Sequence, residues 1–101
     1  MLFRSWRGDV VAVAKRALQA GETLDGEGGY TVWGKLVPAE RSLAEGALPI
    51  GLAHKVPLKH DIAAGAVLLW ADVDVPDSAA LRVRRDMEQR FASPSAALAA
   101  Q

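Results

Sequence analysis

A ten-residue unit occurs twice in this chain, and this repeat constrains the fold more than any other feature of the sequence. Residues 15–24 read KRALQAGETL, and residues 59–68, 44 positions further on, read KHDIAAGAVL. The positions that are identical or similar in type are Lys15 and Lys59, Leu18 and Ile62, Ala20 and Ala64, Gly21 and Gly65, Thr23 and Val67, and Leu24 and Leu68. Two copies are too few for a solenoid, which needs about three or more repeats to bury a continuous core.

Each copy follows an apolar stretch and contains a glycine, Gly21 or Gly65, at the same place. Glycine adopts positive φ at little cost, as tight turns require. The repeat therefore predicts two strand–turn–strand units packed about a pseudo-twofold axis, in a mainly β fold.

Length and composition predict one small domain and exclude several classes of protein. A chain of 101 residues, 50% of them hydrophobic, has enough apolar side chains for a core. Its 12 basic and 12 acidic residues balance, which leaves no electrostatic footprint for nucleic acid or for an anionic membrane. Cysteine is absent, so disulfides and thiolate metal sites are excluded, and we expect a cytoplasmic location. No apolar run is long enough to span a bilayer.

Composition divides the chain into four parts. Residues 1–8 are expected to be disordered or artefactual, and they suggest a reading frame cut from a longer gene. Residues 9–76 form the predicted β domain, 77–91 a C-terminal helix, and 92–101 a flexible tail rich in Ala and Ser.

Local patterns predict the elements of the β domain. The strands are expected at 10–14, 23–24, 30–33, 52–58, 67–70 and 73–75, with a helical turn at 17–20, a glycine loop at 25–29 and a short helix at 38–45. In the strand 52–58, alternation places Leu52, His54, Val56 and Leu58 on one face. Pro57 lacks a ladder donor, so this strand should lie at a sheet edge.

The C-terminal helix is predicted from about Ala79 to Phe91, capped by Asp77 or Ser78. Its apolar stripe consists of Ala80, Val83, Met87 and Phe91. We expect this stripe to pack at least partly on a body outside the domain, because the two repeat copies can close the β core without it.

No set of residues forms a self-sufficient catalytic, cofactor or metal site. The glycine loop 25–29 has Thr31 where a dinucleotide fingerprint needs glycine, and no helix follows it. His54 shares a face with aliphatic residues, which favours a core or boundary histidine over a metal ligand. His60 and Asp61 could form an acid–base pair, but a polar pair in a turn is favoured, because the first copy has Arg16 and Ala17 there.

Four residues are candidates for binding a small ligand. Tyr30, Trp33 and Lys35 follow the glycine loop within six residues, and aromatic side chains beside a cation suit small ligands. Lys55 is added as a second cation. Use of Tyr30 and Trp33 in the core is favoured over this role, and the arginines at 82, 84 and 85 are expected to form a solvated helix face.

The repeated pattern Lys-x-x-Leu/Ile-x-Ala-Gly-x-x-Leu resembles the signature of the SAF domain, a β-clip module. That module is found in sialic acid synthase, where it is similar to type III antifreeze protein, in sugar-acid dehydratases and in flagellar P-ring chaperones. A narrower resemblance links the chain to the C-terminal part of homoserine-dehydrogenase-like, NAD(P)-dependent oxidoreductases, including the reductoisomerase-like enzymes that act on deoxyxylulose phosphate. The segments that carry this narrower resemblance are 9–16, 20–34 and 48–53. Segments 70–73 and 84–88 also resemble the C-terminal end of those enzymes.

The resemblance implies a β-clip made of two pseudo-symmetric units, with a short middle helix and a C-terminal helix. It also implies an accessory domain, since the nucleotide-binding fold and catalytic centre of those enzymes lie upstream of the matching part. NAD or NADP and the upstream dehydrogenase domains would then belong to a parent enzyme, whose substrate cleft or dimer this domain helps to close. The alternative is a free-standing module that binds a sugar acid or similar anion through Tyr30, Trp33, Lys35 and Lys55.

Overall fold

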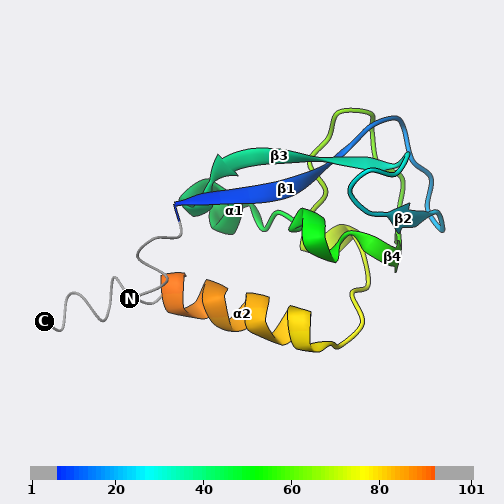
Figure 1. Ribbon diagram of the computed structural model, residues 1–101. Helices are drawn as coiled ribbons and strands as arrows, with labels where there is room; N and C mark the ends of the chain where they lie inside the picture. The colour runs from blue at the N-terminus through cyan, green and yellow to red at the C-terminus, as the bar shows by residue number, and fades with distance from the viewer. Residues whose placement is uncertain (1–6, 93–101) are drawn as a thin grey trace, which may run out of the picture.

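The computed structural model describes residues 7–92, with side chains described as far as residue 90 (Figure 1). The predicted N-terminal segment 1–8 and tail 92–101 lie outside this range except at their inner ends. The elements in chain order are β1 (Gly8–Ala14), β2 (Thr23–Asp25), β3 (Val32–Pro38), α1 (Ala39–Glu45), the 3₁₀ turn η2 (Ile50–Leu52), β4 (His54–Pro57), the 3₁₀ turn η3 (Trp70–Asp72) and α2 (Ala79–Ala92). The fold is therefore rich in strands with two α-helices, as the sequence predicts.

The strand β1 lies at the centre of the domain. It pairs antiparallel with β3 in a continuous register from Gly8 opposite Pro38 to Ala14 opposite Val32. Its last four residues, from Val11 to Ala14, are all buried. Both faces of this segment are covered, which confirms the doubly buried strand predicted from its uninterrupted apolar run.

The two repeat copies meet at Leu18 and Ile62, which exchange two backbone hydrogen bonds of 2.8 Å. Other hydrogen bonds around them occur in pairs related by exchange of the copies. The Gly21 N–H donates to the Leu58 carbonyl, as the Gly65 N–H does to the Ala14 carbonyl, both at 2.9 Å. The Leu58 N–H donates to the Glu22 carbonyl, as the Ala14 N–H does to the Ala66 carbonyl, again both at 2.9 Å. This reciprocity is the hydrogen-bonding pattern of a local twofold that relates the two copies.

The apolar positions of the repeat supply much of the core. The main cluster includes Leu18, Leu24, Ile62 and Leu68, all buried. The same cluster draws on β1 and β3 through Ala12, Ala14 and Val32. Because matched positions of both copies point inward, a single core closes around the local twofold.

The predicted helical turn at 17–20 is wrong. Leu18 is extended and bonded to Ile62 through both its N–H and its C=O, so neither group can join a helical turn. The chain reverses instead at a tight turn, which is closed by a hydrogen bond of 3.0 Å from the Glu22 N–H to the Gln19 carbonyl and has Gly21 at φ 90°. Pairing with the other copy thus overrides the helix preference of Ala and Leu.

Several predicted strands are shorter or more irregular than expected, and the one expected at 73–75 is reduced to a bridge between Val73 and Leu58. The strand expected at 30–33 begins at Val32, because Tyr30 belongs to the glycine loop. The strand expected at 67–70 is reduced to isolated bridges, Val67 with Val13 and Leu69 with Ala47, and Trp70 already starts η3.

Among the strands of residues 7–92, β4 pairs only with β2, so it lies at a sheet edge as Pro57 predicts. The alternation expected for 52–58 fails at Lys55, whose φ of 58° is in the left-handed region. Val56 and Leu58 remain buried, but His54 is exposed. The prediction of a core or boundary histidine at position 54 is therefore wrong, since the backbone turns between His54 and Val56.

Both helices begin, and α1 also ends, at residues that the sequence identifies. α1 follows Pro38 and stops at Gly46, which takes φ 68°. α2 is capped by Ser78, whose hydroxyl oxygen accepts a hydrogen bond of 3.1 Å from the Leu81 N–H. Asp77, the other predicted cap, forms an ion pair with Arg82 instead.

We predict that Gly21→Val and Gly65→Val each lower the free energy of unfolding by more than about 1 kcal/mol. Their φ values are 90° and 80°, and an added Cβ would meet no atom within 4 Å, so the cost comes from backbone strain alone. Urea denaturation measures it. Gly51→Val is the matched control, because Gly51 is equally open but does not have positive φ. Tolerance of valine at both turn positions would contradict the strained-turn explanation.

Candidate functional site

A buried cluster of charges attaches α2 to the rest of the domain. Arg84 on α2 donates two hydrogen bonds to the carboxylate of Asp9 on β1, Nη1 to Oδ1 at 2.7 Å and Nη2 to Oδ2 at 2.6 Å. Its Nε also pairs with Glu88 at 2.8 Å, one helical turn away. The Ser42 hydroxyl on α1 also donates to the Asp9 carboxylate, at Oδ2. One carboxylate thus connects β1, α1 and α2.

The charges in this cluster are satisfied. The side chains of Asp9 and Arg84 are only 5% and 11% exposed. Burial by itself would raise the pKa of Asp9, but the hydrogen bonds from Arg84 and Ser42 outweigh it and lower that pKa. Removing one partner would leave a buried charge without compensation, which is strongly destabilising. The cluster therefore fixes where α2 lies along β1.

A second contact holds the same helix against η3. The guanidinium of Arg85 lies 3.5 Å from the ring centroid of Trp70, within the range of a cation–π interaction. Arg85 also pairs with Glu88 at 2.8 Å. The prediction of a solvated arginine face is therefore wrong for Arg84, whose side chain is only 11% exposed, and incomplete for Arg85, which stacks on an aromatic ring. Only Arg82 matches it, in an exposed pair with Asp77.

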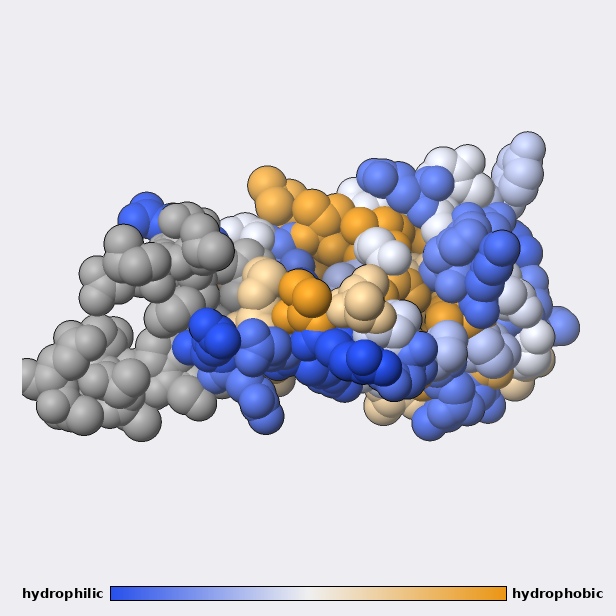
Figure 2. Space-filling model, turned by 60° about the horizontal axis from the view of Figure 1, so that its bottom comes forward, coloured by the Kyte–Doolittle hydropathy of each residue, from blue (hydrophilic) through white to orange (hydrophobic). Residues whose placement is uncertain are grey.

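Two charged residues of α2, Arg84 and Glu88, face the domain, and two of the three described members of its apolar stripe do not. Ala80 is exposed and Val83 is 64% exposed, while Met87 is partly buried. The fourth member of the predicted stripe, Phe91, has no described side chain. Figure 2, in which α2 comes toward the viewer, shows apolar side chains gathered at the centre of this face and bordered by hydrophilic ones. This is a surface suited to a further apolar partner.

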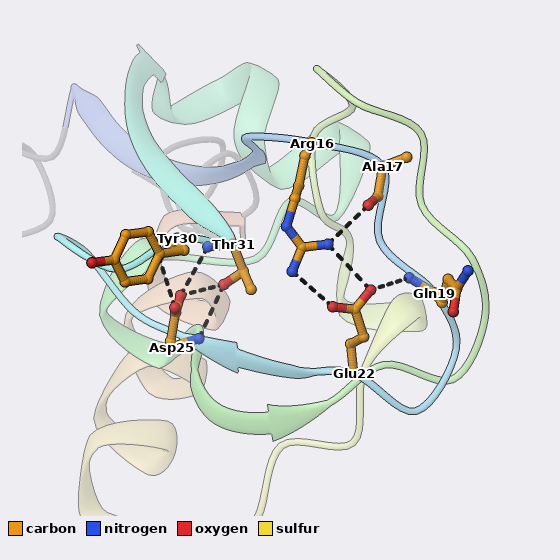
Figure 3. A network of polar contacts seen from close by, with 7 residues as sticks. All are labelled: Arg16, Ala17, Gln19, Glu22, Asp25, Tyr30 and Thr31. Carbon is orange, nitrogen blue, oxygen red and sulfur yellow. Dashed lines mark hydrogen bonds and ion pairs between the residues drawn. The ribbon is translucent and has the colours of Figure 1, made fainter.

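The glycine loop is closed on itself by Asp25 (Figure 3). The Asp25 carboxylate accepts hydrogen bonds from the Tyr30 N–H at 2.7 Å, from the Thr31 N–H at 3.0 Å and from the Thr31 hydroxyl. The hydrogen bonds from the Thr31 hydroxyl and the Tyr30 N–H lower the pKa of Asp25 from 3.8 to about 2. A Cβ on Gly29 would lie 2.3 Å from the Asp25 Cγ, so glycine is required there. These N–H groups already hold a carboxylate of the chain and are not presented to a phosphate.

The turns of the two copies carry different polar contacts. In the first, Arg16 pairs with Glu22 at 2.8 Å, and Glu22 accepts a hydrogen bond from the Gln19 N–H at 2.6 Å (Figure 3). In the second, Asp61 reaches across the local twofold and accepts a hydrogen bond from the Ala20 N–H at 2.8 Å.

His60 contacts Asp72 rather than its neighbour Asp61. Asp72 in turn accepts a hydrogen bond of 2.8 Å from the Leu69 N–H at the start of η3. His60 and Asp61 are therefore both polar turn residues, but His60 contacts Asp72 and Asp61 contacts the Ala20 N–H. The two side chains do not form an acid–base pair with each other.

The four candidate ligand residues do not converge on one pocket. Trp33 and Lys35 lie on the same face of β3, opposite Val13 and Val11 of β1. Tyr30 is 83% exposed in the glycine loop, and Lys55 is exposed on β4 in the other sheet. The prediction that Tyr30 and Trp33 belong to the core is wrong, because Tyr30 is exposed and Trp33 is 42% exposed.

None of these four residues lines either of two open hollows in the described surface. One is lined by Leu43, Arg85, Glu88 and Gln89, and the other by Arg7, Gly8, Leu36, Val37 and Pro38. Within residues 7–92, no group of three or more His, Asp or Glu side chains could hold a metal ion. No helix in the same range is both long and apolar enough to cross a membrane.

No model of a known protein family matches the chain, and no curated protein matches it at a significant level.

We predict that Asp25→Asn lowers the free energy of unfolding at pH 7 by about 1 kcal/mol, because an amide cannot accept all the hydrogen bonds of the carboxylate. The depressed pKa gives a stabilising contribution that is present above pH 3.8 and is lost as the pH falls toward 2. Denaturation of the wild type and the variant should therefore show a stability difference that shrinks between pH 4 and pH 2. Asp74→Asn, which removes an exposed ion pair with Lys59, should show a much smaller difference. A difference for Asp25→Asn that does not change with pH would contradict this explanation.

Proposed function

We propose that this chain is the C-terminal accessory SAF domain, a β-clip, of a cytoplasmic NAD(P)-dependent oxidoreductase of the homoserine-dehydrogenase-like type. In this proposal the domain itself is not catalytic and holds no cofactor. It packs on upstream dehydrogenase domains of the parent polypeptide and contributes to closure of the substrate cleft or to dimerisation.

The local twofold supports the SAF part of the proposal. The signature pattern occurs once in each copy, and its glycines, Gly21 and Gly65, form equivalent hydrogen bonds of 2.9 Å to the strand ahead of the other copy. The pattern thus marks the positions at which the two units hold each other.

The orientation of α2 carries the accessory-domain part of the proposal. A buried ion pair between Arg84 and Asp9 holds the helix in place, and Val83 is left 64% exposed on its outer side. Helices of globular proteins normally turn their apolar stripe toward a core. A helix that turns Arg84 and Glu88 inward and leaves Val83 exposed is well placed to join this domain to a second body.

The second candidate is a free-standing module that binds a sugar acid or similar anion. It is favoured by Trp33 and Lys35, which lie side by side on an accessible face of β3. The genomic DNA upstream of Met1 distinguishes the candidates. An in-frame region that encodes a nucleotide-binding fold supports the accessory domain, whereas a promoter and ribosome-binding site directly before Met1 contradict it.

We predict that the isolated chain neither binds NAD or NADP nor catalyses their reduction, because the Tyr30 and Thr31 N–H groups of its glycine loop already hold Asp25. Isothermal titration calorimetry with each nucleotide should give no saturable signal. Saturable binding at micromolar concentration would overturn this prediction and would make the glycine loop a nucleotide site.

We also predict that amides from Arg82 to Arg90 exchange with solvent orders of magnitude faster than those from Val11 to Ala14 in the isolated chain. A helix of this length is marginal alone in water, and α2 is attached here mainly by polar contacts. Native-state hydrogen exchange measures both segments. Equal protection of the two would show that α2 belongs to this domain's own core.

Matched variants sharpen the exchange experiment. Arg84→Met leaves Asp9 buried without its ion pair and should increase exchange throughout α2. Arg82→Met removes only an exposed pair with Asp77 and should leave exchange in the helix nearly unchanged.

A further inference from the structure

Two backbone N–H groups in the turn of the first copy are each held by a carboxylate of the chain itself. The Gln19 N–H donates to Glu22 at 2.6 Å (Figure 3), and the Ala20 N–H donates to Asp61 at 2.8 Å. These two residues directly precede Gly21, whose φ is 90°. Successive backbone N–H groups in a turn form a concavity that favours anions. The first turn is therefore an anion site that the chain fills with its own side chains.

The turn of the second copy has the same backbone arrangement. Ala63 and Ala64 directly precede Gly65, whose φ is 80°, and both alanines are exposed. A hydrogen bond of 3.1 Å from the Ala66 N–H to the Ala63 carbonyl closes this turn, and the equivalent bond in the first turn measures 3.0 Å. The N–H groups of Ala63 and Ala64 are therefore the counterparts of the two that hold carboxylates in the first turn.

The carboxylates themselves have no counterparts in the second turn. Ala66 occupies the position equivalent to Glu22. Ala17 occupies the position equivalent to Asp61, across the local twofold. A methyl group cannot accept a hydrogen bond, and within residues 7–92 the two equivalent N–H groups of the second turn have no hydrogen-bond partner. The second turn is thus the same site without the side chains that fill it in the first.

The charges of the second copy do not oppose an anion. Besides His60, its ten residues include one basic residue, Lys59, and one acidic residue, Asp61. The Asp61 carboxylate is directed across the local twofold onto the Ala20 N–H. The one acidic side chain of this copy is therefore already bound in the first turn.

We propose that the N–H groups of Ala63 and Ala64 bind the carboxylate of a small organic acid. A carboxylate is the group that the equivalent N–H groups of the first turn bind, and hydrogen bonds to an ionised acceptor are stronger than neutral ones. Water competes for these exposed N–H groups, so we expect dissociation constants on the order of millimolar. The site includes none of the four candidate ligand residues, and it does not depend on the proposed function.

Titration of the full chain with sodium acetate tests the proposal, followed by ¹H–¹⁵N correlation spectra at neutral pH and constant ionic strength. The amide signals of Ala63 and Ala64 should shift saturably. Those of Gln19 and Ala20 should stay in place, because carboxylates of the chain already occupy them. Acetamide, which has the shape of acetate without its charge, should produce no saturable shift.

One variant fills the proposed site from within the chain. Ala17→Asp supplies the counterpart of Asp61 and should raise the dissociation constant of acetate at the Ala64 amide by more than about tenfold, because the new carboxylate competes intramolecularly. Ala80→Asp is the matched control. It adds the same charge at an exposed position of α2 and should leave acetate binding unchanged.

The reciprocal variant empties the first turn. Asp61→Ala frees the Ala20 N–H, whose signal should then respond to acetate as that of Ala64 does. Asp74→Ala removes an exposed carboxylate that pairs with Lys59 and should leave Ala20 unresponsive.

The amide shifts of residues 11–14 verify that each variant keeps the fold. Three results would each overturn the proposal: no saturable shift at Ala63 and Ala64, an equal response to acetamide, or unaltered acetate binding in Ala17→Asp.

Discussion

The backbone pairing of Leu18 with Ile62 is the interaction on which the rest of the structure depends. These residues lie in different copies of the repeat, and each satisfies both backbone groups of the other within the core. Burial of those groups without partners would cost far more than the pairing contributes. Once the two turns are joined, Gly65 is placed beside Ala14 and Gly21 beside Leu58, so the second copy covers the side of β1 that β3 leaves open.

The attachment of α2 follows a different physical logic. A buried ion pair recovers little net free energy after desolvation, but it penalises every arrangement that separates its charges. The contact between Arg84 and Asp9 therefore specifies the position of the helix more than it stabilises the domain. It leaves Val83 outside the core, on the surface on which the proposed function rests.

Features set by neighbouring residues could be predicted from the sequence, whereas those set by distant ones could not. Residues 10–14 as a buried strand, Gly46 as a helix stop and Ser78 as a cap follow from local pattern and capping chemistry. The helical turn at 17–20 was wrong because a partner 44 positions away took the backbone of Leu18. The ion pair of Arg84 with Asp9 spans 75 positions, and only its local half, Arg84 with Glu88, has a spacing that sequence analysis can recognise. Of the four candidate ligand residues, Trp33 and Lys35 share β3, whereas Tyr30 lies in the glycine loop and Lys55 on β4, and sequence proximity could not reveal this separation.

Scalar coupling across hydrogen bonds, measured by NMR on uniformly ¹³C,¹⁵N-labelled protein, tests the central claim most directly. The account predicts a coupling from the Leu18 amide nitrogen to the Ile62 carbonyl carbon and the reverse coupling from Ile62 to Leu18. It also predicts matching couplings from Gly21 to Leu58 and from Gly65 to Ala14. Couplings in one direction only, or in one copy only, would contradict the local twofold as the basis of this fold.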